Sequence, residues 1–186
     1  MTGIPATALL IPSLATDGRI TPGTPSTPLT PPDDRQFGWR MAHLGGIPVA
    51  TYLHPDTVLH VHINGIAKRL PFNPVAWTLA SAWHGAHLPY PLLGAALVTG
   101  LEDGDGNFAP LSPHLVSRTQ NAIAAATTWW RHNHLHLPLW PFILDRPAFA
   151  PAITATRNAF SGSLPAGSHT TPASVQPEPR PALGCR

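Results

Sequence analysis

The sequence predicts an α+β protein with a small mixed or antiparallel sheet of three to five strands, two helices packed on one face, and disordered proline-rich tails. Apolar residues alternate with the period of strands in mid-chain, and two segments that open with proline carry helical periodicity. All six Trp lie between Trp39 and Trp140, and ten of the eleven His lie between His43 and His136. We therefore expect the core in the centre of the chain.

The region that holds the Trp and most of the His residues divides the 186-residue chain into three parts. Residues 37–146 are expected to form a single α+β domain, which is long enough to fold without disulfides or metals. Residues 1–36 are predicted to be a disordered Pro/Thr-rich tail, in which proline recurs every third position from Pro22 to Pro31. That period favours a polyproline II spacer over a P-x-x-P ligand, because no Lys or Arg flanks it closely. Residues 147–186 are predicted to be a mostly disordered Pro/Ala/Ser-rich tail, with a short helix over 150–160.

Composition favours a cytoplasmic protein that has no cofactor and does not enter a membrane. The formal net charge is only +2, so no basic footprint for nucleic acid is evident. The single Cys185 excludes an intramolecular disulfide. The apolar stretch 6–15 contains Pro12 and has no basic residue before it, so no signal peptide is predicted. The apolar run 92–98 is far shorter than the roughly 20 residues that span a bilayer.

Two alternating runs predict the first part of the sheet. Residues 47–53 read as a strand that Pro48 confines to an edge or to a strand start. Residues 58–63 alternate again, with His60 and His62 on one face. Asn64-Gly65 follows, the residue pair typical of a type I′ turn, so residues 66–70 are expected to return antiparallel.

Two segments that begin with proline predict the helices. Asn73-Pro74 has the cap and first-turn residues of a helix that ends near Gly85. Ser112 caps the second helix, which continues towards Pro138. Between them, residues 92–101 are apolar on both faces and predict a central strand, followed by a turn at 104–107.

The same residues form a recognisable pattern, in which paired glycines, Asn-Gly, an L-P-F-N-P-V-A stretch and two later glycines follow one another. The residues that carry it are Gly45, Gly46, Asn64, Gly65, Asn73, Pro74, Gly94 and Gly100. Over roughly residues 44–116 the chain resembles the domain of unknown function family thirty-eight forty-six, found in phages, mobile elements and Gram-positive bacteria. The resemblance implies an accessory protein of a phage or mobile element, but no reaction and no catalytic residues. The chain departs from the family at Ile47 and Pro48, where the family tends to place an aromatic and then a polar residue.

Two groups of residues invite a metal interpretation. His60 and His62 share a strand face, and His132, His134 and His136 alternate, but neither set has a defined third ligand. Histidines tolerated on an exposed face are the favoured interpretation. The D-x-D-x-N spacing from Asp103 resembles the start of a calcium loop, but the positions that need Gly and Glu are Phe108 and His114. A polar turn is favoured, and no metal site is predicted.

Catalytic motifs are not evident. The sequence has no P-loop, G-x-S-x-G or H-E-x-x-H motif, and its central part has few carboxylates for acid–base work. We therefore predict no catalytic residues, and an enzyme remains the third hypothesis for the function.

The surplus of tryptophan favours a binding role instead. Trp129 and Trp130 are adjacent and point about 100° apart on a helix, so one of them should be partly exposed. A small interaction module that meets a protein partner through this helix end or through a sheet edge is the leading hypothesis. A nucleic-acid-associated protein is the alternative, with Lys68 and Arg69 as candidate phosphate contacts. The partner and the oligomeric state stay open.

Overall fold

The computed structural model describes residues 8–13, 26–30, 36–103, 105, 107–133 and 146–162. Within them, five antiparallel strands form one sheet in the order β2-β1-β5-β4-β3. The strands are β1 (Ala8–Ile11), β2 (Thr27–Leu29), β3 (Pro48–His54), β4 (Thr57–His62) and β5 (Ala96–Thr99). The helices are α1 (Gln36–Leu44), α2 (Pro74–His84), α3 (Pro113–Asn133) and α4 (Ala150–Ser161), the last entered through a 3-10 turn, η2 (Arg146–Phe149).

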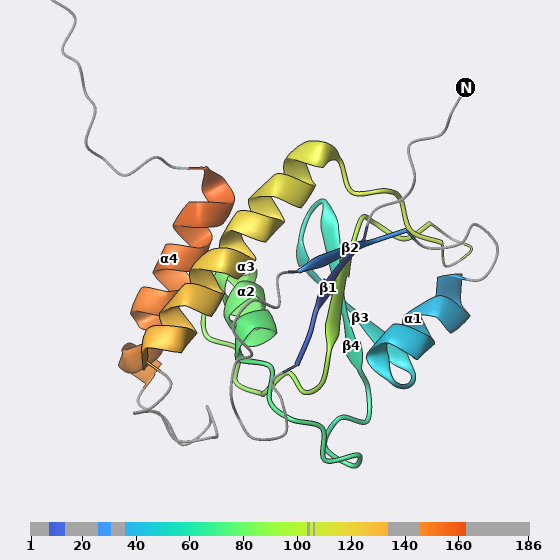
Figure 1. Cartoon of the computed structure of the whole chain (residues 1–186), viewed down its shortest axis with the longest axis horizontal. Helices are drawn as coiled ribbons and strands as arrows, with labels where there is room; N and C mark the ends of the chain where they lie inside the picture. Colours follow the sequence, from blue (N-terminus) through green and yellow to red (C-terminus); the bar gives the residue numbers. More distant parts are fainter. Residues whose placement is uncertain are drawn as a thin grey trace, which may run out of the picture.

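The helices form unequal layers around the sheet. Helices α2, α3 and α4 lie on one side of it, and α1 lies on the other (Figure 1). The predicted α+β class is confirmed, and the two predicted helices, α2 and α3, share one face of the sheet as expected. The prediction did not include α1, which covers the opposite face.

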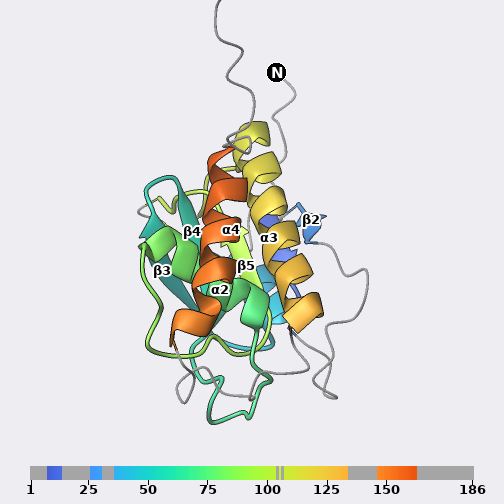
Figure 2. The same ribbon diagram turned by 90° about the vertical axis from the view of Figure 1, so that its left-hand side faces the viewer.

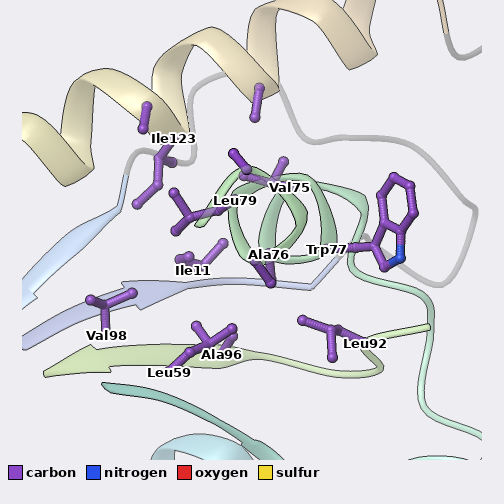
Figure 3. Close-up of a cluster of buried hydrophobic side chains, with 14 of the residues drawn as sticks. Ile11, Leu59, Val75, Ala76, Trp77, Leu79, Leu92, Ala96, Val98 and Ile123 are labelled. Atoms are coloured by element: carbon purple, nitrogen blue, oxygen red, sulfur yellow. The ribbon is translucent and has the colours of Figure 1, made fainter. Parts of the chain in front are cut away.

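The core lies between α2 and the sheet, with α3 closing it from outside. Figure 3 shows Leu79 and Ala76 of α2 above Leu59 and Val98 of the sheet, with Ile123 of α3 alongside. All five side chains are at most 4% exposed. Small residues on α2 let the helix approach the strands closely, so the two layers share one apolar interior.

The start of α2 confirms the prediction made from Asn73-Pro74. The Asn73 side chain accepts a hydrogen bond from the Ala76 N–H at 3.0 Å. Its amide also donates to the carbonyl oxygens of Gly94 at 2.9 Å and of Ile11 and Pro12 at 3.3 Å. Because Asn73 is only 1% exposed, one buried side chain joins the helix start to the ends of β1 and β5.

The sheet extends into the range that the sequence assigned to an N-terminal tail. The structure differs here, because Ala8–Ile11 is an inner strand between β2 and β5, and Thr27–Leu29 is the strand beside it. Leu9 and Ile11 are at most 1% exposed. A run of four apolar residues is the signature of a strand buried on both faces, but a run this short is easily assigned to a tail. The predicted helix over 150–160 is present as α4, which packs on α2 and α3.

The hairpin predicted at Asn64-Gly65 is wrong. Residues 63–69 form consecutive turns, and β4 pairs with β3 and β5 only. Neither Asn64 nor Gly65 has the positive φ that a type I′ turn needs. The hairpin lies one strand earlier, where β3 and β4 are joined through Pro55 and Asp56. The other predicted strands are confirmed, with 92–101 shortened to the central β5.

The glycines of the sequence pattern sit at crowded or left-handed positions. Gly45 has φ +74° and ends α1, and Gly94 has φ +79° before β5. A Cβ at Gly46 would lie 2.2 Å from Nε2 of His62, and one at Gly100 would lie 2.3 Å from the carbonyl oxygen of Ala109. Gly46 and Gly100 therefore mark places where two segments pass too closely for a side chain, and Gly45 and Gly94 supply a left-handed backbone.

Candidate functional site

The four residues predicted to meet a partner do not form one surface. Trp130 is only 6% exposed, and its indole N–H donates to Oγ1 of Thr78 at 2.8 Å inside the helical layer. Trp129 is half-buried against it, as the angular argument predicted. Lys68 and Arg69 are exposed, and Lys68 Nζ donates to the Gly45 carbonyl oxygen at 3.0 Å. Because Gly45 follows α1, this pair lies away from the tryptophans, and the buried Trp130 presents no face to a partner.

The two strand histidines are buried, which corrects the interpretation that they stand on an exposed face. His60 is 0% exposed and His62 is 6% exposed. They lie on the sheet face that α1 covers, where the ring of Phe108 lies 6.0 Å from the ring of His60. Nδ1 of His62 accepts the Asn64 N–H at 2.9 Å. Both histidines are therefore structural members of an interface between sheet and helix.

A cluster of polar side chains surrounds His60, and we call Arg40, Tyr52, His60, Thr99 and Glu102 the polar cluster. Arg40 of α1 forms an ion pair with Glu102, although the two side chains are only 6% and 18% exposed. The second carboxylate oxygen of Glu102 accepts the hydroxyl of Tyr52 at 3.1 Å. The Arg40 guanidinium also lies over the Phe108 ring, 5.4 Å from its centroid. Burial lowers the pKa of Arg40.

Hydrogen bonding determines which ring nitrogen of His60 carries the proton. The Thr99 hydroxyl donates its only proton to the Gly100 carbonyl oxygen at 2.9 Å, so Nε2 of His60 must donate to that hydroxyl oxygen, 2.8 Å away. Nδ1 is then an unprotonated, buried nitrogen that finds no hydrogen-bond partner among the described residues. Burial lowers the pKa of His60 to about 3, and the charge of Arg40 adds to this effect. The ring is neutral at physiological pH.

The polar cluster reaches the surface at strand β3, through Tyr52. This strand is seven residues long and carries no Asp, Glu, Lys or Arg. Tyr52 is 61% exposed and Val49 is 37% exposed, and Ile47, just before the strand, is 49% exposed. The buried Arg40–Glu102 pair thus holds the hydroxyl of an exposed tyrosine, which restricts the directions the ring can take.

The two outer strands of the sheet differ in how well they are protected against pairing with a further strand. Figure 2 shows β2 and β3 on opposite sides of the sheet. Strand β2 has three residues with Pro28 in the middle, and proline on an edge prevents pairing with a further strand. Strand β3 has its proline only at the first position, Pro48. Among the described residues no strand pairs with the outer side of β3, so its backbone is the open edge.

The direction of the free backbone groups follows from one hydrogen bond. The Ile63 N–H donates to the Ile47 carbonyl oxygen at 3.0 Å, so Ile47 and every second residue after it bond towards β4. Ala50 therefore directs its N–H and C=O groups away from the sheet. The register shifts between Thr51 and His54, so this pattern does not extend to Tyr52.

The rest of the described chain shows neither a metal site nor a membrane-spanning helix. No group of three or more His, Cys, Asp or Glu side chains within it is arranged to hold a metal ion. Oδ1 of Asp103 accepts the N–H groups of Asp105 and Asn107, both at 2.9 Å, as in the predicted polar turn. His134, His136 and Cys185 lie outside the described residues. No helix of this part of the chain is long and apolar enough to cross a membrane.

Sequence reasoning identified the strand but not the anchored tyrosine. Pro48 indicated either an edge or a strand start, and in the structure it is the first residue of an edge strand. The partner of Tyr52 is Glu102, 50 residues further along the chain, and no local pattern connects the two. The available signal was the absence of charge over 48–54, which is unusual for an exposed edge.

Comparisons with protein-family models, with curated proteins and with solved structures found no match. The resemblance described above stays a prediction, and the function has to be argued from the described residues.

Proposed function

We propose that this protein is a small interaction module that binds an extended segment of a protein partner along strand β3. In this mode, called strand addition, the partner forms main-chain hydrogen bonds to a free sheet edge and places alternate side chains against it. The observation that carries the proposal is the open edge at Ala50, which has exposed apolar residues and the anchored Tyr52 beside it and no Asp, Glu, Lys or Arg.

The chemistry of the edge supports a protein partner over a nucleic acid. Nucleic-acid contacts are dominated by cations that meet phosphates, and β3 has none. Tyrosine and apolar side chains are typical of the buried centre of a protein interface. Because Glu102 holds the Tyr52 hydroxyl, part of the entropy cost of ordering that ring is met before binding.

The burial of the ion pair is consistent with this role. A buried pair is often no more stabilising than apolar residues of the same volume, because both charges lose water. Arg40 and Glu102 therefore contribute more to positioning Tyr52 than to the stability of the fold. A role in a phage or mobile element stays a prediction from the resemblance alone.

Site-specific photocrosslinking in the producing cell tests the proposal. A benzophenone amino acid at Val49, exposed beside the edge, should yield a crosslinked protein species, whereas the same group at Ala124, exposed on α3, should not. Ala50→Pro removes an outward N–H without removing a bond to β4, and it should abolish the Val49 product. No product from Val49, a product that survives Ala50→Pro, or the same product from Ala124 would refute strand addition.

A further inference from the structure

Three exposed isoleucines lie where β4 ends, at the opposite end of that strand from Asp56. Ile66 is 75% exposed and Ile63 is 55% exposed, and both belong to the turns that follow β4. Ile47, which is 49% exposed, lies opposite Ile63, because the Ile63 N–H donates to its carbonyl oxygen at 3.0 Å. Two exposed cations, Lys68 and Arg69, follow in the same turns. We call these three isoleucines and two cations the turn surface.

Hydrogen bonds hold the turns that carry this surface in place. Within residues 64–70, three N–H groups donate to carbonyl oxygens of the same segment at 2.9 to 3.0 Å. Nδ1 of His62 accepts the Asn64 N–H at the start of the segment. The backbone under Ile66 is therefore ordered, so little further conformational entropy is lost when this side chain binds a ligand.

Arg69 has a backbone conformation that glycine adopts more easily. Its φ is +53°, and no other residue of the described chain except glycines has a positive φ. The conformation is unfavourable for a residue with a side chain, because its Cβ lies close to a backbone oxygen. Side chains kept in such conformations cluster at functional sites. The charge of Arg69 thus gives a reason for its place in the turn.

The described carboxylates lie at the other end of the sheet. Asp56 joins β3 to β4, and Glu102, Asp103 and Asp105 follow β5, which ends beside the start of β4. Strand β4 has six residues and is therefore about 20 Å long. That length is about twice the Debye length at physiological salt, so these negative charges are largely screened from the turn surface. Figures 1 and 2 both show the segment between β4 and α2 projecting beyond the strands, at the lower limit of the described chain.

We propose that the turn surface attaches the protein to a membrane that carries anionic lipids. The isoleucines enter the boundary between headgroups and acyl chains, and Lys68 and Arg69 lie at the level of the lipid phosphates. Attachment of this kind needs no spanning helix, so it is compatible with the absence of one from the described residues. It goes beyond strand addition, because it concerns another surface and another class of ligand.

The chemistry of the turn surface favours lipid over nucleic acid or protein. Its apolar side chains are all aliphatic, whereas aromatic rings stack on bases and are enriched at protein interfaces. Because the isoleucines stand on a projecting segment, they can enter a bilayer surface without a matching cavity in a partner. The two adjacent cations complement the negative charge of anionic headgroups.

Co-sedimentation of the full chain with lipid vesicles tests the proposal. Wild type should bind phosphatidylcholine vesicles that contain about one-third phosphatidylserine roughly tenfold more tightly than vesicles of phosphatidylcholine alone. Ile66→Ser should lower binding to the anionic vesicles by roughly five- to twentyfold, because less apolar surface leaves water. Leu101→Ser, at a 44% exposed residue beyond β5, is the matched control and should bind as wild type does. No binding of wild type to the anionic vesicles, or equal binding of Ile66→Ser, would overturn the proposal.

Arg69→Gly separates the charge of this residue from its structural effect. The variant should bind anionic vesicles about fivefold more weakly. Its free energy of unfolding in urea should stay the same or rise, because glycine is relaxed at φ +53°. Unchanged vesicle binding would contradict a contact between Arg69 and the headgroups.

Two controls distinguish insertion into lipid from other ligands. Soluble glycerophosphoserine should not compete with the vesicles, and competition would show a pocket for a free headgroup instead. A benzophenone amino acid at Ile66 should crosslink to lipid, and a crosslinked protein in its place would assign the turn surface to a protein partner and refute the proposal. Ala50→Pro, which blocks strand addition, should bind vesicles as wild type does, so the two proposals fail separately.

Discussion

The face of the sheet under α2 and the face under α1 carry different residues on the same two strands. On β4 and β5, Leu59 and Val98 face α2, whereas His60 and Thr99 face α1. The first face is closed by three helices and holds most of the core, and the second is closed by one helix through an ion pair and ring contacts. One face thus supplies stability, and the other connects the interior to the open edge at Tyr52.

The largest effect is expected on the apolar face. Leu79→Ala should lower the free energy of unfolding by roughly 2–5 kcal/mol, because Leu79 is 0% exposed and its removal leaves a cavity between α2 and the sheet. Urea unfolding measures the change. Ile66→Ala, at a residue that is 75% exposed, is the matched control and should stay within about 0.5 kcal/mol of wild type. Equal losses in both variants would contradict the assigned core.

On the polar face, Arg40→Ala should lower the free energy of unfolding by about 1–3 kcal/mol, because the part-buried carboxylate of Glu102 keeps its charge without its partner. The double variant Arg40→Met with Glu102→Leu should recover most of this loss in urea unfolding, since it removes both charges and fills the space. The recovered protein should nevertheless give less of the Val49 crosslink, because Tyr52 has lost its anchor. A double variant as unstable as Arg40→Ala would show that the pair itself stabilises the fold.

His60 should make stability depend on pH. The pKa of His60 is about 3 in the folded protein and about 6.5 in an unfolded chain. Between these values the unfolded state binds a proton that the folded state does not, so the free energy of unfolding falls as the pH falls. The loss due to this ring should reach up to about 2 kcal/mol at about pH 5.

Urea unfolding at about pH 7, 6 and 5 measures this slope in wild type and in His60→Gln, which keeps a hydrogen-bonding amide but does not titrate. The variant should show a flatter profile over the same range. Parallel profiles in the two proteins would mean that His60 takes up its proton without opening the α1 face.

The smallest change in stability is expected for Tyr52→Phe. The ring is 61% exposed, so the loss of its hydroxyl contact should alter unfolding by less than about 1 kcal/mol. The yield of the Val49 crosslink should fall by roughly two- to tenfold, because the freed ring must be ordered when a partner binds. Tyr90→Phe, at an exposed ring outside β3, is the control for this yield. An unchanged yield would separate the polar cluster from partner binding at the edge.

Local signals explain which elements were predictable. Asn73-Pro74, Ser112-Pro113 and the period-2 runs in β3 and β4 depend on neighbouring residues, and each appears where expected. The predicted Asn64-Gly65 hairpin is wrong because β4 pairs with β5 instead of with residues 66–70. After the turns that follow β4, Phe72 forms an isolated β-bridge with Leu93. Tertiary pairing thus overrode a strong turn signal.

The candidate site was less predictable than the fold. Trp129 and Trp130 were selected because exposed tryptophan is typical of interfaces, but Trp130 fills the space beside Phe149 at a ring distance of 5.4 Å. Composition counts aromatic residues without indicating which of them the core uses. The other surface named in that hypothesis, a sheet edge, is the one on which the proposed function rests, and it stays a prediction.

The amino-acid sequence alone determined the α+β class and the capped starts of α2 and α3, because each depends on the conformational preferences of adjacent residues. For β3 it left an edge or a strand start at Pro48 as alternatives. Only the tertiary structure decided that Ala8–Ile11 enters the sheet, that His60 is buried and neutral, and that Glu102 holds Tyr52 at the open edge. These features depend on contacts between residues far apart in the chain, whose energies come from burial and hydrogen bonding after the layers pack.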